Sequence, residues 1–93
     1  MPFKVWITDD AARDLGGYVV NQIERALSSL SDSPERGAYP KELLALGIRE
    51  YREVFFKPYR IIYTITAESV FVLLVADGRR DLQALLQRRL LEG

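Results

Sequence analysis

Four arginines are the side chains of this sequence best suited to hold an anionic group. Arg79 and Arg80 follow a long apolar run and precede a segment with helical spacing. Arginine is unfavourable at the start of a helix, where the dipole is positive, so an anionic partner or an acidic neighbour should explain this pair. Arg52 and Arg60 fall on two neighbouring strand-like segments. Together the four arginines form either a grip for an anionic partner or part of a charged surface.

The chain contains no histidine and no cysteine. Histidine is the usual general base near neutral pH and the commonest metal ligand. Without cysteine there are no disulfides, thiol nucleophiles or thiolate metal sites. We therefore expect no metal and no cofactor, and any catalysis would have to use Arg, Lys, Tyr, Asp or Glu.

The size and charge of the chain limit its class. A chain of 93 residues has room for one hydrophobic core, so we expect one domain over residues 1–93. Its formal net charge is zero, which argues against a generic nucleic-acid binder. No apolar run approaches the ~20 residues of a membrane span, and acids stand where a signal peptide needs its apolar segment. We expect a cytoplasmic protein with no membrane partner.

Hydrophobic spacing predicts a small α+β domain. Its antiparallel sheet would carry the N-terminal helices on one face, together with a C-terminal helix. Gly16-Gly17 should weaken or bend the first helix near its start. Arg88 and Arg89 suit the end of the last helix, where cations are favourable, and read as a surface pair. The predicted elements are a strand over 3–8, a helix from about 10 to 31, a short helix over 40–47, strands over 48–56, 59–66 and 70–76, and a helix from 81.

The turn between the second and third predicted strands decides which side chains share a face. Pro58 cannot take the positive φ of a type I′ turn, so a loop of three or five residues is expected. That register pairs Phe56 with Arg60 and places Arg52 and Arg60 on one polar face, roughly 8–10 Å apart. A shift by one residue would separate the two arginines onto opposite faces. In the expected register, without that shift, the other face forms a core of Tyr51, Phe55, Ile61, Tyr63 and Ile65.

Two stretches carry a resemblance to a known family. They read "LGIREYREVFFKPYRIIYTI" and "SVFVLLVADGRRDLQALLQRRLL". The Tyr-Arg-apolar pattern on the third strand and the Gly-Arg-Arg-Asp after the fourth resemble those of the RelE/ParE superfamily, the toxic halves of bacterial type II toxin–antitoxin pairs. The element order and the chain length are similar as well. The resemblance implies a growth-inhibiting toxin that forms a hetero-oligomer with a cognate antitoxin, whose otherwise unfolded segment wraps around it.

The superfamily resemblance implies two possible modes of action. RelE-like members are ribosome-dependent endoribonucleases that cut mRNA in the decoding site without a metal. They use basic residues and a C-terminal tyrosine to drive attack of the ribose 2′-OH on the adjacent phosphate. ParE-like members are not nucleases. They bind DNA gyrase, stabilise cleaved DNA and stop replication.

The nuclease mode would place catalytic roles on a few basic residues. The resemblance maps its phosphate-binding arginines onto Arg52, Arg60 and Arg80. Arginine almost never loses its proton and is therefore a poor general base. Lys57 in the hairpin loop, or Tyr63 if it is accessible, would have to serve instead.

Two departures from the nuclease pattern favour the other mode. Val54 stands where a second lysine is expected, and Leu86 occupies the place of the C-terminal tyrosine. The sequence therefore favours a non-enzymatic toxin that acts on DNA gyrase, with an mRNA endoribonuclease whose partners are the ribosome and mRNA as the alternative. A relative of the fold without toxicity, which binds only the antitoxin, is the third reading. In either mode the expected target-binding residues are Arg52, Arg60, Arg79 and Arg80.

The antitoxin should cover apolar surface. The predicted strands and helices carry more apolar residues than so small a core can hide. The resemblance implies an antitoxin partner, and the residues expected to contact it are Val54, Ile62, Leu82 and Leu86.

Overall fold

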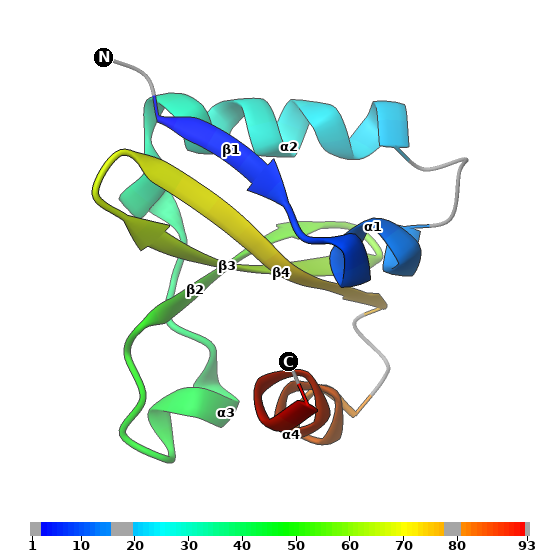
Figure 1. Cartoon of the computed structure of the whole chain (residues 1–93), viewed down its shortest axis with the longest axis vertical. Helices are drawn as coiled ribbons and strands as arrows, with labels where there is room; N and C mark the ends of the chain where they lie inside the picture. The colour runs from blue at the N-terminus through cyan, green and yellow to red at the C-terminus, as the bar shows by residue number, and fades with distance from the viewer. Residues whose placement is uncertain (1–2, 16–19, 78–80, 93) are drawn as a thin grey trace.

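The computed structural model describes residues 3–15, 20–77 and 81–92 of the chain. In this part, a four-stranded sheet lies between helices, so the predicted α+β class is confirmed (Figure 1). No helix in the described residues is long and apolar enough to cross a membrane. The elements are β1 (Lys4–Ile7), α1 (Asp9–Leu15), α2 (Val20–Asp32), a 3₁₀ turn η1 (Pro34–Arg36), α3 (Lys41–Leu44), β2 (Tyr51–Phe56), β3 (Tyr59–Thr66), β4 (Ser69–Asp77) and α4 (Leu82–Glu92).

The sheet has the strand order β1-β4-β3-β2. β2, β3 and β4 form the predicted antiparallel meander, whereas β1 pairs in parallel with β4. Parallel pairing needs a long crossover connection, and the helices and strands between β1 and β4 supply it. β4 lies inside the sheet, as its unbroken apolar run predicts, and Val70, Val72 and Leu74 are buried.

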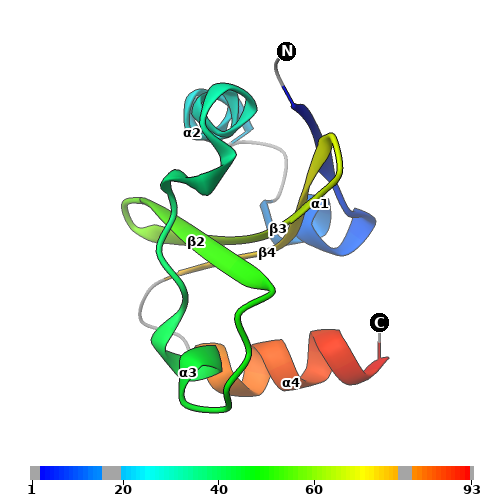
Figure 2. The same cartoon turned by 90° about the vertical axis from the view of Figure 1, so that its left-hand side faces the viewer.

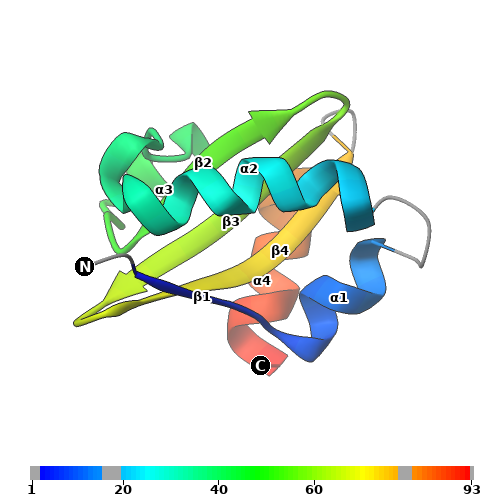
Figure 3. The same cartoon turned by 90° about the horizontal axis from the view of Figure 1, so that it is seen from above.

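Helices cover both faces of the sheet. Figures 2 and 3 show α1 and α2 on one side and α3 and α4 on the other. Each side has its own apolar core. The first core contains Ala11, Ala26, Leu27, Leu30, Val54, Ile61, Tyr63, Val70, Val72 and Val75. The second contains Leu43, Ile62, Leu74, Ala76, Leu82 and Leu86.

The predicted N-terminal helix is two helices, α1 and α2. The side chain of Thr8 caps the first, because its hydroxyl accepts a hydrogen bond of 3.1 Å from the backbone N–H of Ala11. In the second, Ala26, Leu27 and Leu30 recur at helical spacing and are buried against the sheet. Gly16-Gly17, which carried the expected weakness of this helix, lies outside the described residues.

The hairpin between β2 and β3 has a shorter turn than predicted. Only Lys57 and Pro58 lie between the paired residues Phe56 and Tyr59. The Lys57–Pro58 peptide bond is cis, which suits the third position of a type VI turn, a turn that the sequence argument did not consider. The register is therefore one residue away from the predicted one.

This register changes the two faces of the hairpin. Arg52 lies opposite Tyr63, and Arg60 lies opposite Phe55. Because side chains alternate along a strand, Arg52 and Arg60 stand on opposite faces of the sheet, and the prediction that they share one face is wrong. The same shift takes Phe55 out of the predicted core, and its side chain is 63% exposed.

The C-terminal helix is capped at its start and hydrogen-bonded to the sheet near its end. Asp81 caps its start by accepting a 3.2 Å hydrogen bond from the N–H of Ala84. Near its other end, Nη1 of Arg89 donates a 2.6 Å hydrogen bond to the carbonyl oxygen of Leu73. Leu73 is the residue that the β3–β4 pairing skips, because the register shifts between Ile62 and Tyr63. Arg89 therefore contacts the sheet, whereas the sequence analysis predicted only a surface position for it.

Candidate functional site

Arg60 lies at the centre of a buried charge network. Its Nη1 and Nη2 atoms donate hydrogen bonds of 2.9 and 3.0 Å to the two carboxylate oxygens of Glu42. Its Nε and Nη2 atoms donate bonds of 2.9 and 2.6 Å to Oε2 of Glu53. Arg60 is 9% exposed, and Glu53 is buried as well. Two carboxylates thus surround one guanidinium, and the local charge of this cluster is negative.

The network joins three elements. Glu42 belongs to α3, Glu53 to β2 and Arg60 to β3, so the contacts hold the one-turn helix against the sheet. The hydrogen bonds that Glu42 accepts from Arg60 are the main cause that lowers the pKa of Glu42 from its ordinary value. The same hydrogen bonds, which the Glu42 carboxylate accepts, are the main cause that raises the pKa of Arg60. The sequence argument missed Glu53 because its register put this residue on the other face from Arg60. It missed Glu42 because no local pattern predicts the contact of α3 with β3.

Arg52 fastens a loop on the opposite face of the sheet. Its Nη1 donates to the carbonyl oxygens of Glu35 at 3.2 Å and Gly37 at 2.9 Å. Its Nη2 donates to the hydroxyl of Tyr39 at 3.1 Å, and the guanidinium carbon lies 4.6 Å from the centre of that ring. These contacts tie the segment before α3 to β2. Arg52 thus holds the protein's own backbone.

Tyr63 is a core residue, as its reading from the sequence suggested. Its buried hydroxyl donates a 2.6 Å hydrogen bond to the carbonyl oxygen of Pro34 and accepts one of 3.0 Å from the N–H of Gly37. Burial raises the pKa of this hydroxyl above its ordinary value. A buried phenol with both hydrogen-bonding roles used is not available as a general base.

Of the remaining predicted catalytic and target-binding residues, the structure describes Lys57 alone. Lys57 is exposed in the β2–β3 turn. Arg79 and Arg80 lie outside the described residues, so their predicted role stays a prediction. The described residues contain no group of His, Cys, Asp and Glu that could hold a metal ion.

The four expected antitoxin contacts are core residues. Each is at most 5% exposed, because helices cover both faces of the sheet and not one. The prediction that their side chains form an open apolar surface is therefore wrong. These residues are Val54, Ile62, Leu82 and Leu86. The exposed large apolar side chains in the described residues are Trp6, Ile7, Tyr39, Leu44, Leu46 and Phe55.

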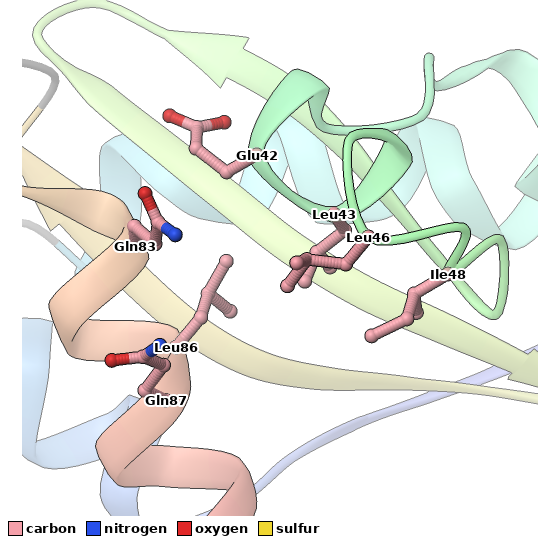
Figure 4. Close-up of a pocket in the computed structure, with 7 residues that line it drawn as sticks. All are labelled: Glu42, Leu43, Leu46, Ile48, Gln83, Leu86 and Gln87. Atoms are coloured by element: carbon pink, nitrogen blue, oxygen red, sulfur yellow. The ribbon is translucent and has the colours of Figure 1, made fainter.

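Described residues line at least three surface hollows. An apolar groove of about 340 Å³ separates α3 from α4, and Figure 4 shows its lining side chains. A second hollow of about 320 Å³ lies beside the stacked pair Arg52 and Tyr39. A third, of about 360 Å³, lies between Tyr39 and Phe55, and Arg60 also lines it.

The Glu42–Arg60 pair predicts a specific loss of stability in acid. A carboxyl whose pKa is lower in the folded state stabilises the fold above its unfolded pKa, near 4.5. That contribution is lost as the pH falls from this value through the folded pKa. We expect urea unfolding at about pH 7 and about pH 3 to show a smaller pH-dependent loss for Glu42→Gln than for the wild-type protein. Glu68→Gln, which changes an exposed turn residue, is the control, and equal pH dependence in all three proteins would contradict the assignment.

Comparisons with known proteins agree with this fold. The family model for the ParE toxin of type II toxin-antitoxin systems, parDE, matches residues 6–82. Among solved structures, a similar one is the E. coli toxin RelE, an arginine-to-alanine mutant in the free state. The match has a TM-score of 0.68 and 20% sequence identity, and it covers 95% of this chain and 98% of that chain. At this identity the likeness to RelE shows the shared fold. A comparison with curated proteins finds no match. The chain therefore belongs to the family of ParE toxins of type II toxin–antitoxin systems, and as the toxin of such a pair it has an antitoxin as its partner.

Proposed function

We propose that the protein is a ParE-like toxin that binds DNA gyrase in the cytoplasm, stabilises cleaved DNA and stops replication until its antitoxin neutralises it. One observation carries the choice of this mode over nuclease action. The two described arginines that a phosphate clamp would need lie on opposite faces of the sheet, and both are occupied by groups of the protein itself. This favours a toxin that acts through surface contacts with its target.

The chemistry of RNA cleavage explains why this observation matters. A metal-independent nuclease must aim free donors at the phosphate on which negative charge develops. The donors of Arg60 point at Glu42 and Glu53, and the net negative charge of this cluster repels a phosphate. Leu86, in the place of the nuclease tyrosine, is 1% exposed and has no group that transfers a proton.

The proposal predicts gyrase-dependent DNA breakage. Purified toxin incubated with gyrase, ATP and supercoiled plasmid should give linear plasmid with protein attached to its ends, and toxin without gyrase should leave the plasmid intact. In cells, induction should produce filaments with damaged DNA before protein synthesis falls. Plasmid linearisation on a gel and pulse-labelled protein synthesis measure the two effects.

Lys57→Ala separates the two modes. A ribonuclease of this family would need Lys57 as its base among the described residues, so this variant would lose most of its toxicity. A gyrase poison needs no general base, and we expect Lys57→Ala to retain plasmid cleavage. If translation stops within minutes, mRNA is cut only in the presence of ribosomes and Lys57→Ala is inactive, the gyrase proposal is wrong.

A further inference from the structure

The strand β1 forms one edge of the sheet, and Figure 3 shows it beside β4. The N–H groups of Lys4 and Thr8 each donate a 3.1 Å hydrogen bond to a carbonyl oxygen on the β4 side. Backbone groups alternate in direction along a strand, so those of Val5 and Ile7 point away from the sheet. Within the described part of the chain, no hydrogen bond reaches these outward groups. They are open to pairing with another strand.

The open part of this edge is short. At its start, the N–H of Phe3 donates a 2.8 Å hydrogen bond to the carbonyl oxygen of Ser31, and the Ser31 hydroxyl donates one of 2.8 Å to the carbonyl oxygen of Phe3. At its end, the chain leaves the strand and α1 begins at Asp9. A second strand can therefore pair only with Val5 and Ile7.

Apolar side chains accompany the open backbone groups. Trp6 is 52% exposed and Ile7 is 37% exposed, although residues of both types are largely buried in most proteins. Sheet edges are normally protected by charged side chains, proline or a bulge. Lys4 is the single charged residue of β1, and it lies outside the open part of the edge. An apolar edge of this kind is typical of a surface that another chain covers.

We propose that β1 pairs antiparallel with β1 of a second copy of this chain, so that two toxins share one continuous sheet. One register uses every open group. With Trp6 opposite Trp6 of the second copy, Val5 of each copy faces Ile7 of the other and exchanges two hydrogen bonds with it. Sliding the strands by two residues would place an open residue opposite Phe3, whose groups are used, or Asp9, which belongs to α1.

The apolar side chains of this register fit each other. Val5 and Ile7 form pairs on one face of the joined sheet, and the two Trp6 side chains meet on the other face, in the type of pair that brings side chains closest. Each Trp6 also lies opposite Phe71 on β4, so the aromatic side chains form a row across the joint. Opposite residues of an antiparallel pair point to the same face, so α3 and α4 of both copies lie on the same side of the dimer.

The charges at the ends of β1 favour the same orientation. In the proposed register Lys4 lies opposite Thr8 of the second copy, and the exposed Asp9 follows Thr8. A cation and an anion therefore meet at each end of the pairing, whereas a parallel arrangement would set Lys4 beside Lys4. Because the edge complements itself in hydrogen bonds, apolar side chains and charge, a second copy fits it without any further component.

Sedimentation velocity and tryptophan fluorescence test the dimer. Trp6 is the only tryptophan of the chain, so its emission reports on this edge. As the concentration of purified toxin rises from nanomolar to high micromolar, the sedimenting species should change from a monomer of 10.7 kDa to a dimer. The emission of Trp6 should shift to shorter wavelengths over the same range, because the second copy removes water from the indole. A toxin that stays monomeric throughout would overturn the proposal.

Ile7→Pro tests the backbone pairing. The proline ring removes an N–H that points away from β4, so the β1–β4 ladder keeps its bonds. The dimer loses one hydrogen bond from each copy and should form at least about tenfold more weakly. Phe55→Pro is the matched control, since it changes an exposed apolar residue on β2, at the opposite edge, and should leave dimerisation unchanged. If circular dichroism shows both variants folded and both dimerise equally well, β1 is not the interface.

A charge exchange tests the orientation. Lys4→Glu brings two acids together at each end of the dimer, and Asp9→Lys brings two cations together, so each variant alone should dimerise at least about threefold more weakly. In an equimolar mixture of the two variants, opposite charges meet again at both ends, and dimers should form as readily as in the wild-type protein. A mixture that dimerises no better than the separate variants would contradict the antiparallel pairing.

The antitoxin is the other candidate for this edge. If the emission of Trp6 is constant in the free toxin at all concentrations and shifts only after antitoxin is added, the edge binds the antitoxin and the dimer proposal fails. Plasmid cleavage by gyrase is a separate readout, so failure here leaves the gyrase proposal standing, and the reverse also holds.

Discussion

Replacing Arg60 by alanine is expected to lower the free energy of unfolding by about 3–5 kcal/mol, the usual result when one partner of a buried ion pair is removed. The variant would leave Glu42 and Glu53 close together without the cation that both contact. Two carboxylates in a poorly solvated site repel each other and lack the hydrogen bonds that Arg60 donates. Urea unfolding followed by circular dichroism at neutral pH measures the loss.

Two further variants separate the buried network from a general effect of charge. Lys57→Ala removes an exposed cation in the β2–β3 turn and should change the stability by less than about 0.5 kcal/mol. In the Arg60→Ala background, Glu42→Gln with Glu53→Gln removes the unpaired charges and should recover part of the lost stability. An Arg60→Ala protein with wild-type stability and reduced toxicity would show that Arg60 serves the target and not the fold.

Gly37→Ala should destabilise the protein by about 3 kcal/mol, the upper end of the usual cost of overpacking. An added methyl group at Gly37 would collide with the Tyr63 hydroxyl and would lie 2.6 Å from the carbonyl oxygen of Glu53. Neither neighbour can withdraw easily. The Tyr63 hydroxyl is bonded to Pro34, and the backbone of Glu53 is paired with Ala38 on both its N–H and its carbonyl group.

Gly47→Ala provides the matched comparison. Gly47 has a φ of +76° with open space around it, so an alanine there carries only the backbone cost of roughly 1–2 kcal/mol. Thermal unfolding of both variants should therefore rank Gly37→Ala as the less stable. If Gly47→Ala is destabilised as much as Gly37→Ala, close packing is not the reason for glycine at position 37.

Sequence patterns predicted the element order because buried apolar residues recur along each helix or strand with the repeat of that element. The unbroken run in β4 and the leucine spacing of α4 both have this origin. The register of the β2–β3 hairpin depends instead on the geometry of two turn residues, Lys57 and Pro58. A shift of one residue exchanged the faces, so the predicted site contained Arg52 with Arg60, whereas the structure contains Glu53 with Arg60.

The predicted exposure of four apolar residues was wrong for a different physical reason. Spacing shows that Val54, Ile62, Leu82 and Leu86 belong to apolar faces, but it does not show how many helices cover those faces. The one-turn helix α3 and α4 together bury Ile62, Leu82 and Leu86 in a second core. The exposed apolar residues beside that core, Leu44 and Leu46, lie in and just after a short helix whose orientation depends on Glu42 and Arg60. No local pattern in the sequence encodes that long-range contact.

The bulge in β4 determines where α4 can sit along its own axis. In the regular parts of the β3–β4 ladder, backbone carbonyl groups have partners on the neighbouring strand, but the pairing skips Leu73. Arg89 reaches that carbonyl in one axial position of the helix, and sliding by one turn, about 5.4 Å, would carry it out of reach. The bulge thus fixes the axial position of the last helix relative to the sheet. It thereby decides which side chains of α4 face the groove between α3 and α4, where Gln83, Leu86 and Gln87 form the far wall.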